Sequence, residues 1–319
     1  MAAELVPGTE ATQRRGLLRR PINPVLPTLL GAACISSSAI VSRLADTSPA
    51  TTSFYRCVLA LPVLAALAVV EQHRRGRRPW RTRLVSVGAG MCLGVDLVLW
   101  THAIYDVGAG IATVLANLQV LFVTFVAWTL MRERPRFQFL LALPVVLFGV
   151  ALLAGVASHT GPAFHPLAGV LYGLSASVSY SAFILVFRRS TQRSSHVAGP
   201  LADATLGAAI TSLLFGFAIG QMRFSLSAHS LEWLILLALT SQTLGWLLIT
   251  SSLPRLPAAL SSLLLLFQPA ASLVLAAIVL SQRPTALQLV GAVLVCGGVV
   301  AAARSRVEDE VTASAPTPG

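Results

Sequence analysis

"LQVLFVTFVAWTLMRERP" (Leu118–Pro135) and "FQPAASLVLAAIVLSQRP" (Phe267–Pro284) decide the fold, because they are two versions of one pattern. Both stretches are almost wholly apolar, carry a glutamine as the second residue, and end in Arg-Pro. The second stretch also carries Pro269 inside the run. Proline removes a backbone donor and bends a helix, so an amide and a proline inside an apolar helix need a structural reason.

The composition indicates a membrane protein in contact with the lipid bilayer. Of 319 residues, 55% are hydrophobic and only 11% are charged, whereas soluble domains carry roughly 25% charged residues. The charges form clusters, and the apolar runs between them are about 18 to 25 residues long, enough to cross a hydrocarbon core. The net charge of +11 does not predict nucleic-acid binding, because no soluble basic domain carries it.

The apolar runs predict an all-α integral membrane protein with ten transmembrane helices. Within a bilayer the backbone must satisfy its own hydrogen bonds, and segments of this length do so as helices. The predicted spans are 25–43, 50–70, 84–104, 108–130, 137–156, 167–187, 200–220, 231–251, 257–280 and 285–303.

The arginines predict the orientation of these spans. With the N-terminus inside, the cytoplasmic segments hold 19 of the 23 basic residues, the outer segments hold three, and one lies within a span. This asymmetry places both termini in the cytoplasm. All of the basic residues are arginine, a hint of a GC-rich bacterial genome, so the expected membrane is the bacterial plasma (inner) membrane. Residues 1–24 form the predicted N-terminal segment, and the acidic, Pro-rich residues 304–319 a disordered tail.

The two opening stretches belong to a longer internal repeat. An offset of 149 residues pairs Gln119 with Gln268, Arg134 with Arg283, and Gly149 with Gly298. The predicted repeats, 25–156 and 157–303, hold five helices each. Because five is odd, the second repeat begins on the opposite side of the membrane and is inverted relative to the first. Inverted repeats of this kind build alternating-access transporters with the substrate near the midplane.

At this point the chain resembles a known family. The stretch "SPATTSFYRCVLALPVLAAL" (48–67) and the helix ends "LMRERP" and "LSQRP" resemble the EamA-like branch of the drug/metabolite transporter superfamily. Tyr55-Arg56 matches an aromatic-Arg pair that is common in the family's second span. Val120 replaces the family's proline in span 4, and Gln282 replaces its acidic residue in span 9. The resemblance implies secondary transport of small metabolites, often the export of amino acids or related compounds.

Three charged residues fall inside predicted spans and more than two residues from either end, where each needs a reason because its insertion costs about 2.5 to 3.5 kcal/mol. Arg56 and Asp96 lie at similar depths in consecutive spans, so we expect an ion pair between them. This pair is either a structural clamp or an element whose pairing changes with substrate or proton. Asp203 begins span 7, where its charge suits a helix N-terminus; a role in ion coupling is the alternative.

Polar and aromatic residues near the midplane are the candidates for substrate binding. An amide both donates and accepts, so it can bind a zwitterion or a sugar hydroxyl; interhelical hydrogen bonding is the alternative role. Pro269 is the candidate hinge, because it frees a backbone carbonyl beside the site. The candidate substrate-binding residues are Gln119, Gln268, Trp100, Tyr180, Gln242, Trp246 and Ser38.

Three pairs of glycines four residues apart predict faces where helices approach closely. They are Gly90/Gly94, Gly169/Gly173 and Gly216/Gly220. Glycine has no side chain beyond hydrogen, so two backbones can lie against each other there.

The sequence holds no signature of an enzyme, cofactor site or metal site. Nucleophile-elbow, zinc-protease, Walker and dinucleotide-binding motifs are absent. The inverted repeats and the resemblance to the EamA-like branch together imply a secondary transporter, and an exporter, of a small polar metabolite such as an amino acid. The alternative is a membrane-embedded enzyme or lipid-handling protein. Substrate identity, the oligomeric state, and the use of protons, exchange or the solute gradient alone stay open.

Overall fold

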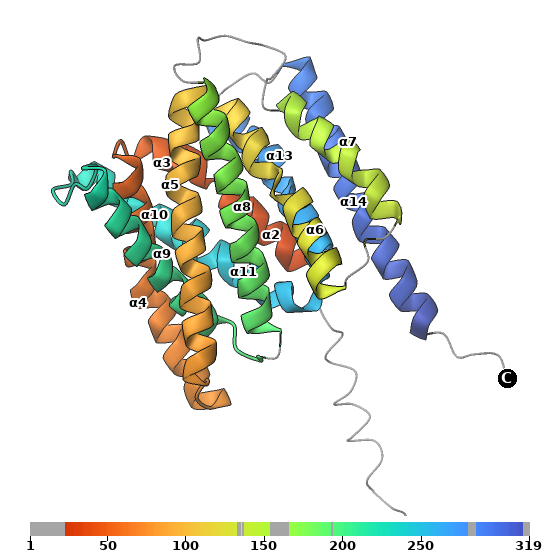
Figure 1. The fold of residues 1–319 in the computed structure, drawn as a ribbon, viewed down its shortest axis with the longest axis horizontal. Coiled ribbons are helices and arrows are strands. Elements are labelled where there is room, and N and C mark those ends of the chain that lie inside the picture. The colour runs from red at the N-terminus through yellow and green to blue at the C-terminus, as the bar shows by residue number, and fades with distance from the viewer. Residues whose placement is uncertain are drawn as a thin grey trace, which may run out of the picture.

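The computed structural model describes residues 23–132, 135, 137–153, 166–192, 194–279 and 285–314. These residues are helical or form turns and connections, with no strand among them (Figure 1). The helices are α2 (Val25–Ser36), α3 (Ser38–Leu44), α4 (Pro49–Arg75), α5 (Trp80–Asn117), α6 (Gln119–Met131), α7 (Phe137–Leu153), α8 (Pro166–Thr191), α9 (Ala198–Ala218), α10 (Ala228–Leu237), the π-helix η1 (Ala238–Gly245), α11 (Trp246–Ser252), the 3₁₀-helix η2 (Leu253–Arg255), α12 (Ala258–Leu265), α13 (Phe267–Val279) and α14 (Ala286–Ser314).

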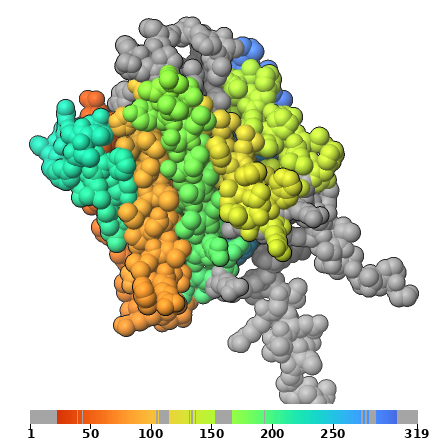
Figure 2. All heavy atoms as spheres, in the orientation of Figure 1, coloured from red at the N-terminus to blue at the C-terminus, as the bar shows by residue number. Residues whose placement is uncertain are grey.

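Each predicted span contains an apolar helical segment, as a multi-pass membrane protein requires. Six are long enough to cross a bilayer by length and composition: Val25–Ser42, Pro49–Arg75, Trp80–Ala103, Leu167–Thr191, Ala198–Ala218 and Ala228–Arg255. Four are shorter: Leu115–Leu130, Phe137–Leu152, Ala258–Ser272 and Ala286–Ala301. The outer surface carries large apolar side chains, among them Leu130, Phe137 and Leu167, each more than 70% exposed, which suits contact with lipid. Helices α5 and α8 lie side by side along the face shown in Figure 2.

Helix α5 extends over the loop that the sequence predicts between spans 3 and 4. The ring of His102 lies 5.6 Å from that of Tyr172, and a Cβ on the adjacent Gly173 would lie within 2.8 Å of Leu115. Residues 102 and 115 would be about 20 Å apart along a straight helix. Since both contact the same turn of α8, the chain turns back within α5. The predicted change of direction is present, and its turn is helical.

Equivalent helices of the two repeats run antiparallel. Glu71, near the end of α4, binds the backbone at the start of α9, whereas Ser48, just before α4, binds the carbonyl of Gln221 after α9. In the same way, Gly149 of α7 lies against Gly291 at the start of α14, and Gly298 further along α14 lies against Val146. Both pairs therefore have the inverted relation that the odd number of helices per repeat predicts.

Corresponding helices of the two repeats also pack against corresponding neighbours in the opposite repeat. Helix α5 of the first repeat packs on α8, and the corresponding span of the second repeat, η1 with α11, packs on α2. Likewise α6 packs on α8, and its counterpart α13 packs on α2. The two halves thus use the same contacts with their roles reversed: spans 3 and 4 pack on span 6, and spans 8 and 9 pack on span 1.

Spans 4 and 9 are both interrupted at nearly equivalent positions, beside the paired glutamines. Leu118 (φ −62°, ψ −11°) separates α5 from α6, and Leu266 (φ −65°, ψ −7°) separates α12 from α13. Each donates its backbone N–H to the carbonyl three residues earlier, a tighter turn than in an α-helix. Pro269 accounts for the interruption in span 9 by removing a donor. Span 4 has Val120 in place of the proline, so its interruption has another cause.

The C-terminal tail departs from the prediction. Helix α14 continues through Ser314, so residues 304–314 are helical where the sequence predicts disorder. Once the apolar span has formed, continuing a helix costs less than nucleating one, which allows a polar segment to extend it. Residues 1–22 and 315–319 lie outside the described part of the chain.

Glycine brings α5 and α9 into backbone contact. A Cβ on Gly90 would lie 1.8 Å from the carbonyl oxygen of Ala204, and one on Gly94 would lie 2.6 Å from Cβ of Thr211. This pair therefore forms the predicted packing face. Gly216 also packs closely, with its Cβ position 3.1 Å from that of Ala50, but Gly220 has φ +66° and no neighbour within 4 Å, because it lies in the turn after α9.

Candidate functional site

Arg56 of α4 is buried inside the bundle and is held by the second repeat. Its Nε donates to Oε1 of Gln242 at 3.2 Å, and its Nη2 donates to Oγ of Ser241 at 3.2 Å. The amide of Gln242 in turn donates to Oγ1 of Thr205 in α9, also at 3.2 Å. A guanidinium can be buried only when its donors are satisfied, and here two consecutive side chains of span 8 satisfy two of them.

The π-helix η1 explains how Ser241 and Gln242 both reach Arg56. In a π-helix each turn holds an extra residue, and such turns are frequent at functional sites. Thr243 donates its hydroxyl to the carbonyl of Ala238, five residues earlier, which satisfies a carbonyl inside the widened segment. The hydroxyl-rich sequence "TSQT" (240–243) within an apolar span is the only sequence signal for this feature.

Asp96 of α5 is buried near Arg56 but is not bound to it. The two side chains interact electrostatically, yet no ion pair within 4.0 Å and no hydrogen bond joins them in the structure. The ion pairs among the described residues are Arg75–Glu71, Arg78–Asp203 and Arg83–Asp203. The expected contact between Arg56 and Asp96 is therefore absent, because η1 occupies the guanidinium. The carboxylate of Asp96 is 8% exposed, and no residue that the structure describes forms a hydrogen bond with it.

Tyr180 and Gln268 complete the group around Asp96. Tyr180 of α8 interacts with the side chain of Gln268 in α13 and, electrostatically, with Asp96 and Arg56. The ring of Trp246 lies 6.4 Å from that of Tyr180. We call Arg56, Asp96, Tyr180, Gln242 and Gln268 the central polar group. It draws on five helices, α4 and α5 from the first repeat and α8, η1 and α13 from the second.

Gln119 lies beside the same part of α8. Its side chain is buried, its Oε1 has no hydrogen-bond partner, and its backbone carbonyl accepts from Oγ of Ser181 at 3.2 Å. Since Ser181 follows Tyr180, both paired glutamines approach one turn of α8. Trp100 and Ser38 are half-buried, and in the described part of the chain no hydrogen bond or ring contact joins either to the central polar group.

The sequence analysis missed two polar residues and gave a third, Asp203, a different role. Ser241 and Thr205 are small hydroxyls whose role appears only once span 8 is placed against α4 and α9. Asp203 lies in the second turn of α9, not at its first residues, and pairs with Arg78 and Arg83 at the end of the bundle. That pairing, and not the helix dipole alone, accounts for its burial. Among the residues that the structure describes, no three His, Cys, Asp or Glu side chains lie together as a metal site would require.

Comparisons with known proteins place this architecture in a family. One solved structure, titled only "Crystal structure of protein", has the same fold, with a TM-score of 0.72 at 19% identity over 88% of this chain and 97% of that chain. A search of curated proteins finds no match. The model of the EamA-like transporter family matches residues 24–155 and again residues 167–304. The chain is a multi-pass membrane protein and belongs to the EamA-like transporter family.

Proposed function

We propose that this protein is a secondary transporter that exports a small polar metabolite, such as an amino acid, across the bacterial inner membrane. In this proposal ten spanning helices form two inverted repeats, 25–156 and 157–303, with both termini in the cytoplasm. Alternating access between the repeats exposes the substrate first to one side and then to the other. The arginine asymmetry supports the orientation, and the family supports transport.

The central polar group is the observation that carries this proposal. Charged side chains inside a membrane protein are costly and mark substrate or ion pathways. Here Arg56 and Asp96 come from the first repeat, and Tyr180, Gln242 and Gln268 come from the second. A site assembled from both repeats changes when the repeats move, which is what alternating access requires.

The arrangement of the charges favours a zwitterion as the substrate. Arg56 and Asp96 lie near each other without forming an ion pair, so a ligand with both charges can bind between them. Arg56 would hold a carboxylate with its remaining donors, and Asp96 would hold an ammonium group. The polar atoms of the ligand would then form hydrogen bonds with the amides of Gln119 and Gln268 and with the Tyr180 hydroxyl.

Asp96 is also the candidate for coupling to protons. A buried carboxylate without a hydrogen-bond partner can take up and release a proton without breaking an established contact. Exchange of substrates, or flow down the solute gradient, needs no such group. A variant that removes the charge but keeps the shape of Asp96 separates these mechanisms.

The primary test is transport by purified protein in liposomes with a panel of amino acids, sugars and nucleosides. We expect saturable flux of at least one zwitterionic amino acid. Flux confined to sugars or nucleosides would overturn the zwitterion, and folded protein that moves nothing on the panel would count against transport of these solutes.

Variants then locate the site. Arg56→Gln and Asp96→Asn should each lower kcat/KM at least tenfold, while Asp46→Asn, an exposed aspartate between α3 and α4, should not. If Asp96 carries protons, Asp96→Asn should abolish accumulation driven by a pH gradient and retain exchange across the membrane. Full activity in both Arg56→Gln and Asp96→Asn would reject the central polar group as the site.

A further inference from the structure

A hollow with basic walls opens at the end of the bundle where α4 ends, α5 begins and α8 ends. Its volume is about 630 Å³, and its lining includes Arg77, Arg78, Arg81, Arg189 and His196 together with serine and threonine hydroxyls. No acidic side chain is among the described residues that line it. We call this feature the basic hollow. It lies far along α4 from Arg56, at the last turn of that helix, so it is separate from the central polar group.

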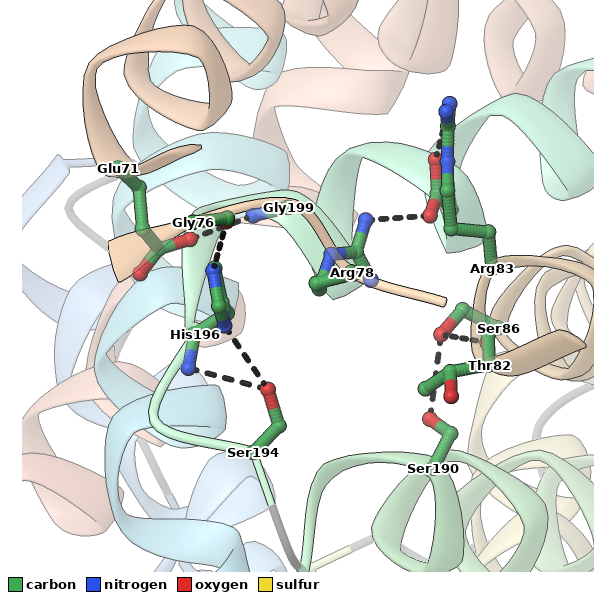
Figure 3. A network of polar contacts seen from close by, with 11 residues as sticks. Glu71, Gly76, Arg78, Thr82, Arg83, Ser86, Ser190, Ser194, His196 and Gly199 are labelled. Carbon is green, nitrogen blue, oxygen red and sulfur yellow. Dashed lines mark hydrogen bonds and ion pairs between the residues drawn. The ribbon is translucent and has the colours of Figure 1, made fainter. Parts of the chain in front are cut away.

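The carboxylates near the basic hollow are already engaged. Glu71 accepts from the backbone N–H of Val197 at 2.6 Å and from that of Gly199 at 3.0 Å. Figure 3 shows the contact with Gly199. Asp203 binds Arg78 and Arg83. Within the part of the chain that the structure describes, no carboxylate is left to pair with Arg77, Arg81 or Arg189, so the hollow has an excess of positive charge.

The walls of the hollow are fixed by hydrogen bonds. His196 binds the carbonyl of Gly76 through Nε2 at 3.0 Å and the hydroxyl of Ser194 through Nδ1 at 3.3 Å (Figure 3). On the opposite wall Ser86 binds Ser190 at 3.2 Å. Nη1 of Arg78, a residue of the lining, is buried and has no hydrogen-bond partner among the described residues. A rigid wall with excess positive charge and an unused donor is suited to an anion.

The position of the basic hollow indicates which class of anion is near it. Trp80, the first residue of α5, is 66% exposed, and the guanidinium of Arg81 lies 5.7 Å from the centre of its ring. Exposed tryptophans at helix ends are typical of the level of the lipid headgroups. Basic pockets between transmembrane helices at that level bind anionic headgroups, and arginine binds phosphate oxygens with two parallel hydrogen bonds.

We propose that the basic hollow binds the phosphoryl group of an anionic phospholipid headgroup. Arg77, Arg81 and Arg189 would supply the charge, and Arg78 and the hydroxyls would supply directional donors. Free phosphate has the same tetrahedral oxyanion, so the test must separate the two sources. The proposal does not depend on the transported substrate.

The test measures thermal unfolding of the purified full chain in a neutral detergent at constant ionic strength. Short-chain phosphatidylglycerol, phosphatidylcholine and inorganic phosphate are titrated separately. We expect phosphatidylglycerol to raise the melting temperature saturably and phosphatidylcholine to leave it unchanged. Arg189→Gln and Arg77→Gln should each raise the half-saturating concentration several-fold. The matched control, Arg74→Gln, removes one exposed arginine of the same helix end outside the hollow and should change it little.

Native mass spectrometry of the same proteins gives a second readout, the number of phosphatidylglycerol molecules retained, which does not depend on a change in stability. Equal binding by the Arg189→Gln and Arg74→Gln variants would mean diffuse attraction and would overturn the site. A saturable response to inorganic phosphate alone would keep the anion site but overturn the lipid as its source. No response to either ligand in both readouts would reject the proposal altogether.

Discussion

At the scale of single residues, the hydrogen bonds of Arg56 decide whether a charge can be buried in α4. Gln242→Ala removes the acceptor of the Arg56 Nε hydrogen bond, so that Ser241 is the remaining hydrogen-bond partner of the guanidinium. A hydrogen bond to a charged group contributes about 1.5 to 3 kcal/mol, so we expect the free energy of unfolding to fall by that amount. Reversible denaturation of the purified protein in mixed micelles measures it.

Gln221→Ala is the control for this prediction, because Oε1 of Gln221 is buried without a hydrogen-bond partner. Its loss should cost less than that of Gln242. A double-mutant cycle between Gln242→Ala and Arg56→Gln should be non-additive by at least about 0.5 kcal/mol. Additive losses would mean that the two side chains do not depend on each other.

For the Asp96→Asn variant we expect a smaller loss of stability than the loss of a buried ion pair would cause. Breaking a direct buried pair costs about 3 to 5 kcal/mol. Because no described residue forms an ion pair or a hydrogen bond with Asp96, Asp96→Asn should change the free energy of unfolding by less than about 1 kcal/mol, whatever it does to transport. The same denaturation assay measures it, and a loss in the range of a direct pair would show that Arg56 and Asp96 are joined in the membrane.

At the scale of helices, the contact between α5 and α9 depends on glycine. In Gly90→Ala the new methyl group would meet the carbonyl of Ala204, so the helices must separate, and overpacking of this kind costs about 1 to 3 kcal/mol. Gly88→Ala is a matched control on the same helix, since no atom lies within 4 Å of its Cβ position. Alanine is the better helix former, so Gly88→Ala should hold or raise the melting temperature while Gly90→Ala lowers it. Equal effects would contradict the close contact.

The helices also show which parts of the fold could be predicted from the sequence. Hydropathy acts over whole segments, so the positions of the apolar spans could be predicted, and Gly90/Gly94 could be identified from spacing alone. The offset between Gln119 and Gln268 predicted the repeat, and the odd number of helices in each repeat predicted its inversion. These features depend on local composition or on symmetry, and both are visible in one chain.

Other features depend on contacts between distant helices and could not be predicted. The π-helix that presents Ser241 and Gln242 is stabilised by the buried charge of Arg56, which lies in the other repeat. The interruption at Leu118 could not be predicted from a proline, because span 4 has none near that position. The absence of the Arg56–Asp96 contact also depends on distant helices. Similar depth in neighbouring spans predicts that two residues lie near each other, but it does not predict which side chain forms a hydrogen bond with the guanidinium.

At the scale of the whole molecule, the seam between α4 and α9 limits how the repeats can move. Glu71 ties the two helices at one end, and Ser48 and Thr51 bind the carbonyl of Gln221 at the other, at 2.5 Å and 3.1 Å. Spans 4 and 9, by contrast, are each interrupted at mid-span. We therefore expect the α4–α9 seam to stay closed while the access pathway opens through movement of the interrupted spans.

Two disulfides test this expectation in a chain whose native cysteines have been replaced. Ala50→Cys/Gly216→Cys joins α4 to α9 where the two Cβ positions are 3.1 Å apart, and Leu115→Cys/Gly173→Cys joins the segment before the Leu118 interruption to α8, where they are 2.8 Å apart. Both distances are somewhat shorter than the usual Cβ separation in a disulfide, about 3.5 to 4.5 Å, so each bond forms with a small adjustment. The first should leave most of the liposome flux intact. The second should stop it until a reductant is added. Loss of flux on oxidation of the first pair would show instead that the halves separate along α4 and α9, as rigid bodies rocking apart at that seam would do.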